Sequence, residues 1–161
     1  MVPGLIPDDI PHHGTNPVNS VAKAWASAGL RTPLLFHALV YAGSLHLDFL
    51  RWSKIYPNSP LALSHKLEAI QKIREVISSG NEAARDEVIL AILIIASNEV
   101  INVTEEEKKP FNSPLTKVQW LNIYGNIRPD LDHLKAVSAL ICLKGGIESL
   151  NLHGLAEIIT M

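Results

Sequence analysis

Apolar residues recur at helical spacing through long segments of the chain, and this pattern predicts an all-α fold. After Ser59 and Pro60, charged side chains take one arc, and the apolar stripe comprises Leu63, Leu67, Ile70, Ile73 and Ile77. Residues three or four positions apart lie on one face of an α-helix, so we expect this stripe to be buried. Gly80 and the serines before it are expected to end the helix.

Prolines, capping residues and glycines divide the rest of the chain into further predicted helices. Thr32 and Pro33 are typical of a helix start, whereas Gly29 is expected to end the helix before them. The predicted helices comprise residues 18–28, 34–52, 60–77, 85–103, 115–124 and 129–144, with one more short helix within 147–161. We expect about six to seven helices, arranged as antiparallel helical hairpins and packed as a bundle or superhelix.

Two of these helices carry further apolar positions that we expect to face the core. The helix at 34–52 is apolar almost all round, with residues Phe36, Val40, Leu47 and Leu50 and others between them. The helix at 129–144 is expected to bury Leu134, Val137, Leu140, Ile141 and Leu143. Gly145 and Gly146 follow it directly and are typical of a helix end.

The segment from Val88 to Ala96 is ambiguous by local propensity, because five of its nine residues are β-branched and would suit a central strand. Three features favour a helix. The acids Asp86 and Glu87 suit a first helical turn, the apolar block continues past Ala96, and no neighbouring segment offers a strand to pair with. We therefore expect a buried helix at the centre of the bundle.

The length of 161 residues suits one domain with a single core. Residues 1–17 contain four prolines and two glycines, so we expect a flexible lead-in there and a single helical domain at 18–161. The last predicted helix has no closing signal. From this we expect the chain to be truncated at its C-terminus.

Composition and charge restrict the classes of function. The net charge is −2, and the Lys and Arg residues are scattered, so direct contact with DNA is not expected from this chain alone. The single cysteine, Cys142, rules out a disulfide framework or a thiolate metal cluster built from this chain and suggests an intracellular protein. The start lacks a secretory signal, and the longest apolar run is nine residues, which predicts no membrane span.

Common catalytic signatures are absent from the sequence, and we expect no catalytic residue, no cofactor and no bound metal. One cluster of histidines and an acid in the sequence comprises His37, His46 and Asp48. On a helix, positions nine apart point in nearly opposite directions, so these two imidazoles are not expected to share a ligand.

A second polar group is explained by helix geometry. Asp130 and Asp132 lie in a predicted first turn, where the helix dipole favours acids, and His133 is expected to help dock that helix end. Arg51, Trp52 and Lys54 form a candidate partner surface at the end of another helix. Burial of Trp52 in the core is the alternative interpretation.

Three helical blocks with polar residues follow one another in a fixed order. The first is Ser64-His65-Lys66-Leu67-Glu68-Ala69-Ile70, the second runs from Asp86 to Glu99, and the third runs from His133 to Ile147 with its Gly-Gly pair. This order resembles the regulatory (middle, or effector) domain of fungal zinc-cluster transcription factors, the fungal-specific transcription factor domain. The six-cysteine module by which that family binds zinc and DNA is not present in this chain.

The resemblance implies a non-enzymatic, nuclear transcription regulator whose helices bind protein partners or an effector, or associate with a second copy. The alternative is a small-molecule-binding helical protein or an enzyme that uses His37, Tyr41 or His133 in an apolar pocket. A cavity lined by these residues with a shifted imidazole pKa would favour the alternative. An apolar groove without convergent polar groups would favour the regulatory domain.

Overall fold

The computed structural model of the protein describes residues 17–52, 59–80, 83–99 and 129–161. Within these ranges the chain forms six α-helices, α1 (Pro17–Arg31), α2 (Pro33–Trp52), α3 (Pro60–Ser79), α4 (Asp86–Ser97), α6 (Leu131–Lys144) and α7 (Leu155–Thr160), and the 3₁₀ helix η2 (Ile147–Ser149). The same ranges contain no strand. The prediction of an all-α fold is confirmed, and Val88 to Ala96 is helical. The helix expected at 115–124 lies outside the described residues, as do residues 1–16 of the expected lead-in.

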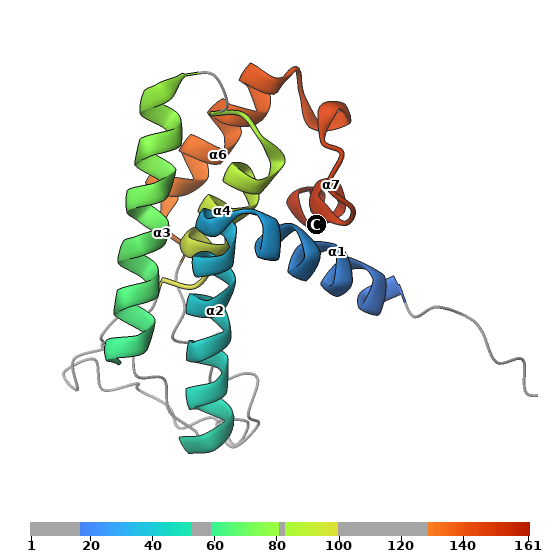
Figure 1. The fold of residues 1–161 in the computed structure, drawn as a ribbon. Helices are drawn as coiled ribbons and strands as arrows, with labels where there is room; N and C mark the ends of the chain where they lie inside the picture. Colours follow the sequence, from blue (N-terminus) through green and yellow to red (C-terminus); the bar gives the residue numbers. More distant parts are fainter. Residues whose placement is uncertain (1–16, 53–58, 81–82, 100–128) are drawn as a thin grey trace, which may run out of the picture.

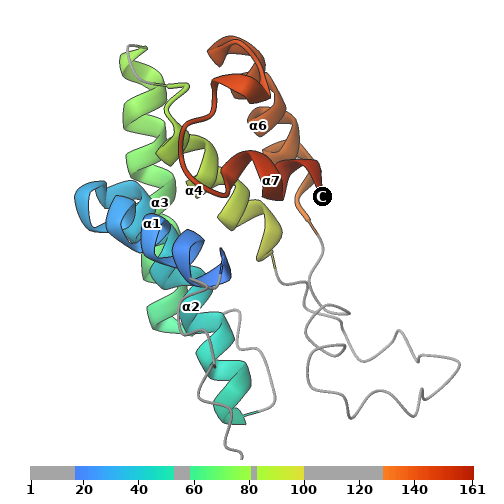
Figure 2. The same cartoon turned by 90° about the vertical axis from the view of Figure 1, so that its right-hand side faces the viewer.

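The helices are arranged around α4. In Figure 1, α2 and α3 lie side by side and run in opposite directions, as expected for a helical hairpin, while α1 crosses one end of α2. Figure 2 shows α4 between this hairpin on one side and α6 and α7 on the other. α4 contacts α2, α3 and α6, so it is the element that joins the two parts of the bundle.

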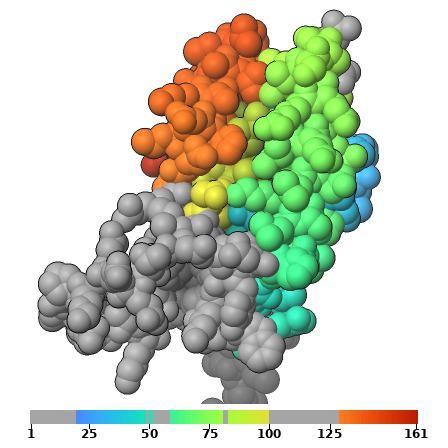
Figure 3. All heavy atoms as spheres, turned by 90° about the vertical axis from the view of Figure 1, so that its left-hand side faces the viewer, coloured from blue at the N-terminus to red at the C-terminus, as the bar shows by residue number. Residues whose placement is uncertain are grey.

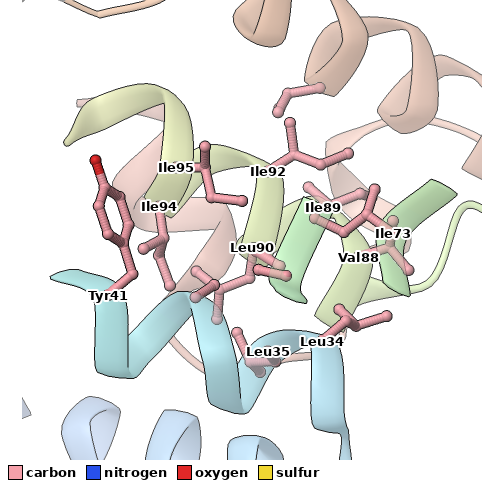
Figure 4. Packing of buried hydrophobic residues seen from close by; sticks show 14 of the residues in the cluster. Leu34, Leu35, Tyr41, Ile73, Val88, Ile89, Leu90, Ile92, Ile94 and Ile95 are labelled. Carbon is pink, nitrogen blue, oxygen red and sulfur yellow. The ribbon is translucent and has the colours of Figure 1, made fainter. Parts of the chain in front are cut away.

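The core is built on α4, as its apolar sequence predicts. Nine of its twelve residues are buried, and Ile89 and Leu90 are fully enclosed. Figure 4 shows Leu34 and Leu35 of α2 and Ile73 of α3 among the side chains that pack with those of α4. Burial of a side chain of this size stabilises the fold by about 1.5–3 kcal/mol.

The buried face of α3 differs from the predicted stripe. Ala62, Ala69 and Ile73 are buried, whereas Leu67 is 59% exposed and Ile77 is 43% exposed. Small side chains let helices approach closely, so the alanines and not the leucines face the neighbouring helices. Figure 3 shows the outer surface of α3, in green, beside α6, in orange. The helical period was correct, but the predicted face was rotated.

The predicted buried positions of two other helices are also corrected. In α2, Leu35 and Ala38 are fully buried, whereas Leu50 is 49% exposed and Phe36 is 40% exposed. In α6, Val137, Leu140 and Ile141 are buried as expected, but Leu143 is 76% exposed. An almost wholly apolar helix such as α2 has no polar arc to indicate its buried side.

Gly29 does not end α1, which continues to Arg31. A Cβ atom at Gly29 would lie 2.7 Å from Cδ1 of Leu39. The glycine therefore permits close contact between α1 and α2. The site requires the absence of a side chain and not the conformational freedom of glycine.

The end of α4 also differs from the prediction. The helix ends at Ser97, six residues before the predicted end.

The chain after Gly146 forms two short helices, η2 and α7, where one was expected. The break between them lies at residues 150–154, where the backbone N–H groups of Asn151 and Leu152 donate to the Asp86 carboxylate. Gly154 then adopts φ 81°, a left-handed conformation that favours glycine. A contact with a distant residue therefore interrupts the helix, which the local sequence does not indicate.

Candidate functional site: an apolar pocket and two ion pairs

An apolar pocket of about 570 Å³ lies between α4, α6, η2 and α7. Its lining is mainly aliphatic and comprises Leu93, Leu134, Val137, Ser138, Ile141, Cys142, Gly146, Ile147, Glu148, Ile158 and Ile159. Pockets that bind small molecules typically measure about 300–1,000 Å³ and are lined by apolar side chains with few polar groups. In size and lining this pocket suits a small apolar molecule.

The Gly-Gly pair shapes one wall of the pocket. Gly145 has φ 108° and Gly146 has φ 103°, conformations that an L-residue adopts at a cost. The Gly146 N–H donates to the carbonyl of Ile141 at 2.9 Å, and the Gly145 N–H donates to Cys142. These bonds end α6 and turn the chain back, so that η2 and then α7 face the apolar side of α6. The predicted role of this pair as a helix end is confirmed.

Few polar groups line the pocket. They are the hydroxyl of Ser138, the thiol of Cys142 and the carboxylate of Glu148. Cys142 is a free, exposed cysteine. None of the three histidine or tyrosine candidates for chemistry, His37, Tyr41 and His133, is part of the lining. The three side chains proposed from sequence for acid–base chemistry therefore do not line this pocket.

His37 lies on the opposite part of the bundle, against His65 of α3. Their Nδ1 atoms are 2.8 Å apart. Burial lowers the pKa of His37, and the nearby His65 lowers it further. Sequence spacing did not indicate this pair, because the two residues belong to different helices and are 28 positions apart. His46, the partner considered from sequence, is exposed on α2.

Tyr41 is a structural residue of the hairpin. Its ring is buried, and its hydroxyl donates to the carbonyl of Asn98 at 2.8 Å. The Lys66 ammonium lies 5.7 Å from the ring centroid and forms an ion pair with Glu99 at 2.5 Å. Burial, and secondly the charge of Glu99, raises the pKa of Tyr41 above its ordinary value. The hydroxyl therefore remains protonated and bonded at neutral pH.

Asp130 caps the start of α6. Its side chain accepts hydrogen bonds from the backbone N–H groups of Asp132 and His133. The His133 N–H bond is the main cause that lowers the pKa of Asp130. The imidazole Nδ1 of His133 lies 2.9 Å from the same carboxyl. Asp132 lies in the first helical turn as expected, whereas Asp130 is the N-cap residue and His133 contacts it.

Asp86 joins three segments that are distant in sequence. It is the first residue of α4, and its Oδ2 atom accepts from the N–H groups of Asn151 and Leu152, both at 2.7 Å. Its Oδ1 atom lies 3.1 Å from Nζ of Lys144. Because this carboxylate is buried, its charge requires these partners.

The two ion pairs connect the three sequence blocks in order. Lys66 of the first block pairs with Glu99 at the end of the second, and Asp86 at the start of the second pairs with Lys144 of the third. These four charged residues therefore link α3, α4 and α6 to one another.

The candidate partner surface is described only in part. Arg51 is exposed in the last turn of α2, and Trp52 is the final residue of that helix. The side chain of Trp52 and the whole of Lys54 lie outside the described residues. The surface formed by Arg51, Trp52 and Lys54 stays a prediction.

Two absences concern residues 17–52, 59–80, 83–99 and 129–161. No group of three or more His, Cys, Asp or Glu side chains in these ranges is arranged to hold a metal ion. Among the described helices, none has the length and apolar character needed to cross a membrane.

Comparisons with protein-family models, with curated proteins and with solved structures found no match to this chain. The class of the protein therefore follows from its own geometry. It is an all-α protein whose described part holds an apolar pocket and two ion pairs that link the helices.

Proposed function

We propose that this chain is a non-enzymatic regulatory domain, similar to the effector domain of fungal zinc-cluster transcription factors, and that it acts in the nucleus by binding an effector. The effector is a small apolar molecule that occupies the pocket between α4, α6, η2 and α7. The single observation that carries this proposal is the pocket itself, with its volume of about 570 Å³ and its aliphatic lining. Protein partners or a second copy would then respond to the bound state.

The arrangement of the three blocks supports the same proposal. The residues that give the sequence its resemblance, Lys66, Asp86, Glu99 and the Gly145–Gly146 pair, all build the framework of the pocket or of α4. A binding domain needs such fixed walls, whereas an enzyme also needs reactive groups that face its substrate. In this bundle, the charged groups of Lys66, Asp86, Glu99 and Lys144 are occupied by structural contacts.

The pocket is also placed where its occupant can influence other parts of the bundle. α7 contributes Ile158 and Ile159 to the lining. The turn before α7 contacts α1, because the indole N–H of Trp25 donates to the carbonyl of His153 at 2.9 Å. α7 could take more than one placement against α6, and a ligand that prefers one of them would change how often the Trp25–His153 hydrogen bond is formed.

The proposal is tested by joining the whole chain to an unrelated DNA-binding domain and measuring transcription of a reporter gene in yeast. The expected result is a reporter level that differs from that of the DNA-binding domain alone. Ser138→Phe, which fills the pocket, should abolish the difference, whereas Ala139→Phe on the adjacent, exposed position should retain it. A fusion that leaves transcription unchanged would contradict the proposed regulatory function.

A further inference from the structure

His37 and His65 direct two imidazole nitrogens into one small volume between α2 and α3. Their Nδ1 atoms are 2.8 Å apart, and the ring centroids are 5.0 Å apart. The ring of Phe36 packs edge-on against both, with centroid distances of 5.4 Å to His37 and 6.3 Å to His65. At this separation one Nδ1 donates its hydrogen and the other accepts it, so one lone pair already points at the other ring.

The two nitrogens are close enough together to bind one ion. Neutral imidazole is a preferred ligand of Zn²⁺, with a Zn–N distance of about 2.0–2.1 Å. With both nitrogens at this distance from the ion and 2.8 Å from each other, the N–Zn–N angle would be about 85–90°. Binding at the tetrahedral angle requires the nitrogens to move apart by about 0.5 Å and both rings to rotate, so that each lone pair turns from the other nitrogen toward the ion.

We propose that His37 and His65 form a two-imidazole site for a borderline transition-metal ion, with Zn²⁺ as its best-suited ligand. The bound ion would link α2 to α3 through one bond to each Nδ1. In the ring whose Nδ1 carried the hydrogen, that hydrogen moves to Nε2 through solvent, so the neutral pair releases no net proton. Water completes the coordination, since no third His, Cys, Asp or Glu in the described ranges is placed to join them.

The charged residues near the pair act in opposite directions. Both imidazoles are half-buried, and Glu68 and Lys72 of α3 are the charged residues that act on His37. Glu68 favours a positive charge there and Lys72 opposes it, and their own contact is long, at 3.9 Å. Burial lowers the pKa of His37, and only a neutral imidazole binds metal. The site does not depend on the apolar pocket or on the proposed regulatory function.

The experiment measures thermal unfolding of the full chain with and without excess ZnCl₂. The parent protein carries His12→Gln and His13→Gln, which removes the adjacent histidine pair near the N-terminus. Ions that bind the native state raise the midpoint of unfolding. We expect ZnCl₂ to raise the Tm of the parent and of His46→Gln, and to leave the Tm of His37→Gln and of His65→Gln unchanged. MgCl₂, which prefers oxygen ligands, should have no effect on any of these proteins.

Calorimetric titration with ZnCl₂ gives a second measurement. Loss of either histidine should weaken binding by at least about tenfold, because a single imidazole holds the ion poorly. Far-UV circular dichroism verifies that each variant is folded, and if one substitution unfolds the chain, the other decides the result. A Zn²⁺-dependent rise in Tm that survives both His37→Gln and His65→Gln, or the absence of any rise in the parent, overturns the proposal.

Discussion

Lys144, in the last turn of α6, forms an ion pair with Asp86, the first residue of α4, and their Nζ and Oδ1 atoms are 3.1 Å apart. The other oxygen of Asp86 accepts two backbone N–H groups from residues 151 and 152. One buried carboxylate therefore ties the last turn of α6 and the chain before α7 to the start of α4. Both the pocket and the core depend on this placement.

Replacement of Asp86 by Ala should reduce the free energy of unfolding by about 3 kcal/mol, because it leaves two backbone donors and the Lys144 ammonium without their acceptor. Urea titration followed by circular dichroism measures the change. The matched control is Asp132→Asn, since that side chain is 89% exposed and its contact with Lys135 is a surface ion pair. The control should change stability by less than about 0.5 kcal/mol. Equal effects of the two substitutions would show that Asp86 does not hold these segments.

Gly154→Ala should destabilise the protein by about 2–4 kcal/mol, because a Cβ atom there would lie 2.6 Å from both methyl carbons of Val21 and φ is 81°. Gly80→Ala is the matched control. Gly80 has a similar φ of 76° but open space around the added atom, so the backbone strain alone should cost about 1 kcal/mol. Chemical unfolding of both variants separates the two contributions. If Gly154→Ala lowered the free energy of unfolding no more than Gly80→Ala, the close contact between Gly154, in the turn before α7, and Val21 of α1 would be refuted.

Tyr41→Phe should lower the free energy of unfolding by about 1–1.5 kcal/mol at neutral pH, through loss of the hydrogen bond to Asn98. The effect should diminish in alkaline solution. Burial raises the pKa of Tyr41 in the folded protein above its ordinary value of 10, so above about pH 10 the unfolded chain loses this proton while the folded chain keeps it. The contribution of Tyr41 is therefore complete below pH 10 and declines as pH rises.

The measurement is the difference in unfolding free energy between the wild-type protein and Tyr41→Phe from pH 8 to pH 11. Other groups that titrate in this range affect both proteins and cancel. A difference that stays constant through about pH 10 would mean that the ring is not shielded from water as the structure places it.

The sequence was informative about which segments are helical and how several of them begin and end. Ser59 and Asp130 cap their helices with side-chain oxygens, and Gly145 ends α6 in a left-handed conformation, because these effects act within a few residues. The central position of α4 also followed from sequence, since a helix that is apolar on every side has no surface to expose.

The sequence was less informative about which face of each helix is buried. Leu67 is more exposed than Ala69, because the contact with α2 and α4 selects small side chains, and Gly29 serves contact with Leu39 and not a helix end. Which side chains are buried, and where a glycine is needed, depends on how closely two helices approach. Helix propensity and hydrophobic periodicity carry no information on that distance.

The candidate sites could not be predicted from local sequence patterns, because they also depend on how separate helices pack together. The pocket requires η2 and α7 to return onto α6, and Asp86 controls that return across 65 positions of sequence. The His37–His65 pair joins two helices of a hairpin whose register is set by packing. Sequence spacing within one helix can exclude a histidine pair, but it does not reveal a pair formed between two helices.

The central claim, that the pocket between α4, α6, η2 and α7 binds a small apolar molecule, is tested most directly by titrating the full chain with Nile red, a neutral dye that fluoresces in apolar surroundings. Saturable binding is expected for the wild-type protein and for Ala139→Phe. Ser138→Phe should lower the affinity by at least about tenfold, equivalent to about 1.4 kcal/mol, because its ring occupies the cavity. Equal binding by Ser138→Phe and Ala139→Phe, or no saturable binding by the wild-type protein, would contradict the account.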